Sequence, residues 1–229
     1  IRRQRQMCIR DSPLSVDRMT TKFWLVIPAA GVGARMAADR PKQYLQIAGR
    51  CILEHTLHCF LDHPGLLAAV VCVAVDDPFW PQLSLARDPR IRRAPGGRER
   101  ADSVLAGLDS LLVGGADSDD WVLVHDAARP NLTPADLARL LESLTDDPVG
   151  GLLAVPVRDT LKRIGSDGRV LETVDRSVIW QAYTPQMFRL GALREALAQA
   201  LEEGVAVTDE ASAMEWAGQS PRLIEGRAD

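Results

Sequence analysis

The chain has 229 residues, enough for one large domain or one domain with an insertion. Hydrophobic residues make up 46% and charged residues 25%, which is typical of a globular protein with a sizeable core. The formal net charge of -4 gives no reason to expect nucleic-acid binding, so an anionic ligand needs a local cluster of Arg and Lys. No apolar run approaches the ~20 residues of a membrane span. The four cysteines are scattered without a C-x-x-C pair, which indicates a reducing compartment, and we expect a cytoplasmic protein.

The first 20 residues are basic and lack the periodicity of a helix or a strand. No apolar segment follows the charges, which excludes a secretory signal, although the Arg content also fits a transit peptide. We expect residues 1–20 to be a disordered or non-native leader, with Met19 as the candidate start. The folded domain is then expected to comprise residues 21–229.

From Phe23 onward, short apolar runs typical of buried strands alternate with segments of helical spacing. The pattern predicts helices over residues 52–61 and 101–112, and a third helix that begins at Pro134 and is capped by Thr133. Strands are predicted over residues 23–27, 67–75, 91–94, 121–124 and 151–157. This order favours a parallel sheet with helices on both faces, and the ligand site of such a fold lies outside the carboxyl ends of the strands. We therefore expect one site to be surrounded by the loops after Ile27, Val75, Ala94, Val124 and Val157.

The alternation breaks between residues 158 and 180. A turn at Gly165–Gly168 separates two strand-like segments, residues 160–164 and 169–174, and predicts an inserted β-hairpin. Because an isolated hairpin is only marginally stable in water, we expect it to pack on a second subunit. Two further helices are predicted over residues 190–203 and 210–216. The expected fold class is α/β: a Rossmann-like, three-layer domain with a mostly parallel sheet and an inserted β-hairpin arm.

A loop of small residues, Pro28–Met36, directly follows the first predicted strand. Ala29, Ala30, Gly31 and Gly33 let the backbone approach a phosphate closely and present N–H groups to it. The spacing is not G-x-G-x-x-G, and the Gly-Lys-Ser/Thr of a Walker A motif is absent. A plain tight turn is therefore the alternative interpretation.

Two cations next to this loop favour a polyphosphate ligand. Arg35 lies in the loop and Lys42 follows it, and a guanidinium and an ammonium beside backbone donors suit phosphoryl or nucleotidyl transfer. Asp126 stands at the carboxyl end of a later strand, where its carboxylate could hold a ribose hydroxyl, a metal ion or an acceptor. The alternative is that Asp126 only caps the turn.

These segments together resemble the 2-C-methyl-D-erythritol 4-phosphate cytidylyltransferases of the non-mevalonate isoprenoid pathway. The resemblance covers essentially the whole chain from Phe23 onward, and its motifs follow one another at matching spacing. They are Pro28–Met36, Pro41–Tyr44, Gly96–Val104, His125–Pro130, Pro156–Thr160, Val174–Arg176, Thr184–Gln186, Thr208–Ala211 and Glu225–Asp229.

The resemblance implies a nucleotidyltransferase in which the phosphate of methylerythritol phosphate attacks the α-phosphorus of CTP and pyrophosphate leaves with Mg²⁺. It implies that Arg35 and Lys42 are catalytic and stabilise the crowded α-phosphate. The Mg²⁺ would be held mainly by the nucleotide phosphates, which agrees with the lack of a carboxylate or His cluster in the sequence. The implied nucleotide contacts are Ala29, Ala30, Gly31 and Gly33 for the triphosphate, Gly96, Gly97 and Ser103 for cytosine, and Asp126 and Ala127 for the ribose.

The resemblance also gives the hairpin a role. It implies a dimerisation arm, residues 158–180, that crosses to a partner subunit in a homodimer. Thr160 and Arg176 would then reach the neighbour's acceptor, with Arg176 positioning its phosphate group. Lesser acceptor contacts are expected from Arg129, Thr184 and Thr208.

Two other functions stay open on the sequence. A ribitol-5-phosphate cytidylyltransferase shares the phosphate loop and the lysine motif, but the segments His125–Pro130 and Val174–Arg176 favour methylerythritol phosphate. A catalytically silent nucleotide-binding dimer module is disfavoured by the presence of both Arg35 and Lys42. The family continues after Gly-Arg-Ala-Asp with Asn-x-Lys, whereas this chain stops at Asp229. We therefore expect a truncated C-terminus, which keeps the silent module open.

Overall fold

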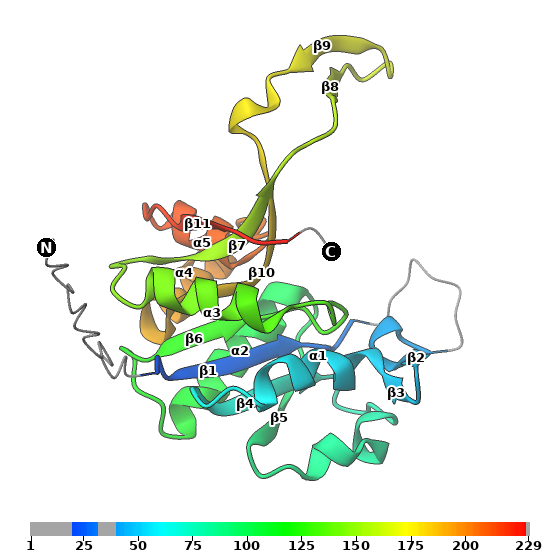
Figure 1. Cartoon of the computed structure of the whole chain (residues 1–229), viewed down its shortest axis with the longest axis vertical. Helices are drawn as coiled ribbons and strands as arrows, with labels where there is room; N and C mark the ends of the chain where they lie inside the picture. Colours follow the sequence, from blue (N-terminus) through cyan, green and yellow to red (C-terminus); the bar gives the residue numbers. More distant parts are fainter. Residues whose placement is uncertain (1–19, 32–39, 228–229) are drawn as a thin grey trace, which may run out of the picture.

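The structure, a computed structural model, describes residues 20–31 and 40–227, so most of the expected leader lies outside the described residues. The described residues form a seven-stranded central sheet of order β11-β7-β10-β6-β1-β4-β5 (Figure 1). β10 runs antiparallel to both neighbours, and the other neighbouring strands pair in parallel. The strands are β1 (Phe23–Pro28), β4 (Leu66–Val73), β5 (Ile91–Pro95), β6 (Trp121–Val124), β7 (Gly150–Pro156), β10 (Trp180–Arg189) and β11 (Arg222–Glu225).

Helices cover both faces of the sheet and give the three layers expected from the sequence (Figure 1). Successive strand residues point to opposite faces, so Leu25 and Ile27 pack in one core cluster and Val26 in the other. The first cluster contains α1 (Ile52–Leu61) and α3 (Pro134–Leu144). The second contains α2 (Arg100–Val113), α4 (Leu190–Glu202) and α5 (Glu210–Trp216). None of the described helices is long and apolar enough to cross a membrane.

The predicted elements of the first 157 residues agree with the structure to within one or two residues. The helix over residues 52–61 and the strand over 121–124 have the predicted bounds. The Thr133 side chain caps α3 by accepting a hydrogen bond from the Asp136 backbone N–H at 3.2 Å, and Pro134 is the first helical residue. The strand predicted to reach residue 75 ends at Val73 instead.

Two strands of the sheet are missing from the prediction. β10 has no continuous apolar run, contains Pro185, and shifts its register against β7 between Ala182 and Gln186. β11 is a four-residue edge strand with three exposed residues. Both lack the local pattern that marks a buried parallel strand. They belong to the sheet because β10 pairs with β6 and β7, and β11 pairs with β7. The structure also has a small hairpin of β2 (Gln46–Ile47) and β3 (Arg50–Cys51), and short 3-10 helices at Lys42–Tyr44, Trp80–Gln82, Ser84–Arg87 and Arg176–Val178.

The predicted hairpin is present between β7 and β10. Its strands β8 (Leu161–Ile164) and β9 (Val170–Val174) pair antiparallel, and Gly168 has a positive φ of 77° in the connecting turn. Figure 1 shows this arm standing well away from the sheet. Apolar side chains on it are exposed, at 60% for Ile164 and 65% for Leu171.

Candidate active site

A cleft of about 800 Å³ lies at the carboxyl ends of β1, β5 and β6. This volume falls within the range of about 300–1,000 Å³ that is usual for small-molecule sites. The described residues that line it come from three of the five loops expected to surround a site, and the loops after β4 and β7 do not contribute. The lining residues are Pro28–Gly31, Lys42, Gln43, Gly97–Arg100, Ser103 and Asp126–Asn131.

A buried glutamine holds the loop that follows β1. The Gln43 side-chain amide donates hydrogen bonds to the backbone carbonyls of Ala29, at 2.7 Å, and Gly31, at 3.2 Å. Gln43 is only 6% exposed, so water competes little for these bonds. Its neighbour Lys42 is exposed and lines the cleft. Sequence reasoning gave Gln43 no role, because a glutamine beside a lysine carries no local signal of the carbonyls it will bind.

The loop after β5 packs directly against the loop after β1. A Cβ on Gly96 would lie 2.1 Å from the Cβ of Ala30, and a Cβ on Gly97 would lie 2.1 Å from that of Asp102. Neither position can take a side chain without movement of a neighbour. The Ser103 hydroxyl accepts from the Gly97 N–H at 3.0 Å and donates to the Glu99 carbonyl at 3.1 Å. Ser103 therefore holds the Gly96–Gly97 turn in place, and these three residues are the predicted cytosine contacts.

The Asp126 carboxylate lies between two guanidinium groups. One oxygen accepts from Nε of Arg100 at 2.9 Å, and the other accepts from Nε of Arg129 at 3.1 Å. Burial alone would raise the pKa of Asp126, but these two arginines outweigh it and hold the pKa below the usual range. Both oxygens of Asp126 thus serve ion pairs in the cleft, which is a different role from capping the turn.

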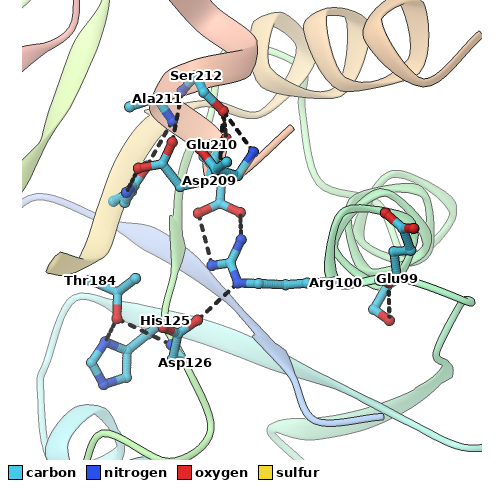
Figure 2. Close-up of polar contacts among 12 residues, drawn as sticks. Glu99, Arg100, His125, Asp126, Thr184, Asp209, Glu210, Ala211 and Ser212 are labelled. Carbon is cyan, nitrogen blue, oxygen red and sulfur yellow. Dashed lines mark hydrogen bonds and ion pairs between the residues drawn. The ribbon is translucent and has the colours of Figure 1, made fainter. Parts of the chain in front are cut away.

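Arg100 continues from Asp126 to a second carboxylate. Its Nη1 and Nη2 atoms contact Glu210 at 2.6 and 3.1 Å (Figure 2). Burial of Glu210 raises the pKa of that carboxyl, while the neighbouring guanidinium opposes the shift. Arg100 and Glu210 lie in the motifs Gly96–Val104 and Thr208–Ala211, but the sequence predicted no role for either residue. They are 110 residues apart in the chain, so only the tertiary structure brings them together.

His125 is buried next to this group and is hydrogen-bonded through both ring nitrogens. Its Nε2 lies 2.9 Å from the Arg129 carbonyl, which can only accept, so Nε2 carries the proton. The Thr184 hydroxyl oxygen accepts from the Asp126 N–H at 3.2 Å and lies 3.0 Å from His125 Nδ1. In the neutral ring Nδ1 accepts, so Thr184 donates to it. The chain of bonds anchors the backbone at Asp126 to β10.

The cleft concentrates positive charge in an acidic protein. Among its described lining residues, Lys42, Arg98, Arg100 and Arg129 are cationic, and Glu99 and Asp126 are acidic. The lining therefore has a net charge of +2, whereas the whole chain has a net charge of -4. Such a local field favours a polyanionic ligand at this position.

The predicted acceptor residues lie in three places: beside the two cavities, next to α5 and on the arm. Arg129 lines the large cleft and also a neighbouring cavity of about 240 Å³, which Thr184 lines as well. Thr208 lies one residue before the N-cap of α5. Thr160 and Arg176 are on the arm and line neither cavity; Arg176 donates to the Arg158 carbonyl.

Two predicted residues, Gly33 and Arg35, lie outside the described residues. The other predicted nucleotide contacts are in or beside the cleft: Ala29, Ala30, Gly31, Gly97, Ser103, Asp126 and Ala127 line it, and Gly96 packs on Ala30. In the part of the chain that the structure describes, no group of three or more His, Cys, Asp or Glu side chains is arranged to hold a metal ion.

A three-layer α/β domain with a small-residue loop after its first strand, and a cationic cleft at the ends of its strands, is typical of Rossmann-like nucleotide-binding proteins. Comparison with known proteins then gives the family. Residues 23–229 match the family model described as IspD, 2-C-methyl-D-erythritol 4-phosphate cytidylyltransferase. The chain belongs to this family of nucleotidyltransferase enzymes, and the resemblance seen in the sequence is confirmed.

Individual relatives agree over nearly their whole length. The 2-C-methyl-D-erythritol 4-phosphate cytidylyltransferase of Ectopseudomonas mendocina is 78% identical over 211 residues, which are 92% of this chain and 90% of the relative. The one from Pseudomonas aeruginosa (strain UCBPP-PA14) is 71% identical over 90% of this chain and 88% of the relative. A crystal structure of 4-diphosphocytidyl-2C-methyl-D-erythritol synthase matches with a TM-score of 0.78 at 44% identity, covering 90% of both chains. The Francisella tularensis IspD structure matches with a TM-score of 0.77 at 35% identity, again over 90% of both chains.

Proposed function

We propose that this protein transfers CMP from CTP to 2-C-methyl-D-erythritol 4-phosphate, giving CDP-methylerythritol and pyrophosphate. The observation that carries the proposal is the near full-length match to cytidylyltransferases of this name, one of them 78% identical. The cleft agrees with it, because a cationic lining beside a loop of small residues suits a nucleoside triphosphate.

In the reaction, a phosphate oxygen of the acceptor attacks the α-phosphorus of CTP in line. The new P–O bond forms while the bond from the α-phosphorus to the oxygen bridging to the β-phosphate breaks, and pyrophosphate leaves with both electrons of that bond. Lys42 stabilises the charge that builds on the α-phosphate oxygens, and we propose the same role for Arg35. The exposed position of Lys42 at the cleft supports this assignment.

The nucleotide is proposed to lie across the three loops of the cleft. The triphosphate binds the loop from Ala29 to Gly33 through its backbone N–H groups from Ala30 onward, because the Ala29 N–H already donates to the Cys72 carbonyl at 2.8 Å. Gln43 holds the Ala29 and Gly31 carbonyls of this loop. Cytosine binds at the Gly96–Gly97 turn beside Ser103. The ribose hydroxyls donate to Asp126, whose side chain is still 32% exposed although both oxygens are ion-paired, with Ala127 alongside.

Mg²⁺ is proposed to enter as the complex with CTP, as part of the substrate. Phosphate oxygens are hard ligands that suit Mg²⁺, and this ion usually keeps several waters and few protein ligands. Both carboxylate oxygens of Asp126 accept from arginines. This supports a metal held mainly by the nucleotide.

The acceptor site is proposed to be completed by a second copy of this chain. Arg176 and Thr160 stand on the arm, away from the cleft of their own subunit, and the arm exposes apolar side chains that suit a partner surface. Arg176 then positions the acceptor phosphate in the partner's cleft. Arg129, Thr184 and Thr208 of that partner supply further contacts.

We further propose that the protein works in the cytoplasm. Cys51 and Cys72 are buried as free thiols, and Cys59 is a free thiol as well. Unpaired cysteines suit a reducing compartment.

A substrate panel tests the activity. Pyrophosphate release is measured with CTP, ATP, GTP and UTP against methylerythritol phosphate and against ribitol 5-phosphate. We expect release with CTP and methylerythritol phosphate. A preference for ribitol 5-phosphate would show that the proposed acceptor is wrong. Absence of pyrophosphate release with every pair would overturn the whole proposal.

Mixing two variants tests the shared site. Lys42→Ala and Arg176→Ala are each expected to be nearly inactive as homodimers. After mixed refolding, half of the dimers carry one subunit of each type, and one of their two sites then combines an intact Lys42 with the partner's intact Arg176. We expect about a quarter of the wild-type activity to return. No recovery, with heterodimers present by mass spectrometry, would place Arg176 in its own subunit's site or outside both.

A further inference from the structure

The carboxylate of Glu210 is buried beside the cleft without lining it. The residue has 0% exposure and is the first residue of α5. Its two oxygens meet Nη1 and Nη2 of Arg100, which comes from the first turn of α2. A carboxylate out of water is costly unless it is paired with good geometry, and a two-point guanidinium contact supplies that geometry.

The pair fixes the orientation of the Arg100 guanidinium beside the cleft. With Nη1 and Nη2 on Glu210, the planar group turns its Nε toward Asp126, which it reaches at 2.9 Å (Figure 2). Asp126 contacts Arg129 with its other oxygen. The direction of the Asp126 carboxylate therefore depends on a residue that the ligand cannot touch.

Glu210 is itself held by a second set of contacts at the start of α5. Asp209 caps the helix by accepting from the Ser212 N–H at 2.9 Å. The buried side chain of Gln186 on β10 donates to Asp209 at 2.9 Å and accepts from the Ala211 N–H at 2.8 Å. These contacts fix the first turn of α5 to the sheet. Because Glu210 belongs to that turn, its position determines where its carboxylate meets the Arg100 guanidinium.

We propose that Glu210 is a positioning residue for the reaction: through its two-point contact with Arg100 it orients Asp126 in the nucleotide site. The proposal rests on the function proposed above. Burial and ion pairing alone would make Glu210 only a stabiliser of the fold. The distinguishing feature is that its partner Arg100 lines the cleft and contacts Asp126 through Nε, and Asp126 also lines the cleft.

A double-mutant cycle tests this role. Glu210→Gln keeps the shape of the side chain and removes its charge. We expect it to lower kcat/KM for CTP by between about 10-fold and 100-fold, the scale of a small misplacement at a reacting site. In an Asp126→Asn background the same substitution should change kcat/KM less than about 3-fold, because the group through which it acts is gone. If Asp126→Asn is too slow to assay, the Kd for CTP from calorimetry completes the same cycle.

Urea unfolding of each variant shows whether it is folded under assay conditions, and kcat/KM of the folded protein then separates a positioning role from a structural one. If Glu210 only stabilises the fold, folded Glu210→Gln protein has wild-type kcat/KM, or the loss has the same factor in both backgrounds, and either result overturns the proposal. Arg100→Lys changes the partly exposed member of the pair, so it is less of a risk to folding than a change at the buried Glu210. A lysine ammonium cannot bridge both carboxylates, so we expect a similar loss of kcat/KM. Wild-type values for folded Arg100→Lys would also overturn it.

A matched control uses an ion pair of α2 that is remote from the cleft. Asp109 on α2 contacts Arg194 at 2.7 Å and lines neither cavity. We expect Asp109→Asn to keep kcat/KM within about 2-fold of the wild type, as is usual for an exposed pair. Wild-type protein that releases no pyrophosphate from CTP and methylerythritol phosphate would refute the proposed function and this inference with it. Active wild type with unchanged Glu210→Gln would refute the inference alone.

Discussion

Gly96 offers a direct test of how closely the two glycine-containing loops of the cleft must pack. In Gly96→Ala the new methyl group would lie 2.1 Å from the Cβ of Ala30. Carbon atoms in contact normally lie about 3.5–4.0 Å apart, so the loops after β1 and β5 must separate by about 1.5 Å.

The expected cost has two parts. Forcing a methyl group into a filled space destabilises a protein by about 1–3 kcal/mol. Because the loop after β1 is the proposed triphosphate site, a displacement of more than an ångström there should lower kcat/KM for CTP by about 100-fold.

The compensating change is Ala30→Gly, which removes the methyl group that is struck and keeps the backbone N–H. In the double variant, the nearest remaining atoms to the new methyl are the Ser103 hydroxyl at 3.3 Å and the Ala30 Cα at 3.5 Å. These distances need only a few tenths of an ångström of adjustment. We therefore expect the double variant to recover to within about 5-fold of the wild type.

The assay is pyrophosphate release with varied CTP for the wild type, both single variants and the double variant, with urea unfolding of each. Full activity of Gly96→Ala would mean that the two loops separate without harm to the site. A double variant no better than Gly96→Ala would mean that the loss does not come from the Ala30 contact, and the steric argument would be wrong.

Three further predictions concern single side chains. Lys42→Ala should lower kcat by about 100-fold while the Kd for CTP changes less, because the lysine acts mainly in the transition state; an unchanged kcat in a single-turnover assay would remove it from the chemistry. Gln43→Leu leaves the carbonyls of Ala29 and Gly31 without their donor, so it should cost about 1–3 kcal/mol of stability in urea unfolding and weaken CTP binding in calorimetry; unchanged binding would show that the loop holds itself. The folded pKa of Asp126 lies below its ordinary value, so this carboxyl contributes stability above about pH 4 that is lost as pH falls through the lowered pKa; acid titration of Asp126→Asn should therefore show a shallower loss of stability below pH 4, and a curve parallel to the wild type would contradict the pairing.

The sequence predicted most of the α/β frame because that information is local. A buried parallel strand such as β6 is a run of apolar residues, and α3 begins with a capping threonine and a proline. The same local signals predicted the arm, where a turn joins two short strands. β10 was not predicted, because its place in the sheet depends on its pairing with β6 and β7 and not on its own composition.

The candidate site was predicted in part for the same reason. Small residues after the first strand, the lysine that follows them and the aspartate at the end of β6 are recognisable where they stand, and the structure brings them to one cleft. The role of Gln43 was not predictable, because it depends on which carbonyls lie within reach after folding.

By itself, therefore, the sequence determined the class of fold and the family, since apolar periodicity and contiguous motifs are properties of neighbouring residues. Only the tertiary structure decided how those groups are held. Arg100 is joined to Glu210 across 110 residues, and Gly96 must be a glycine because Ala30 lies against it. Such contacts depend on the packing of distant elements within hydrogen-bond or van der Waals distance, and no periodicity along the chain encodes that distance.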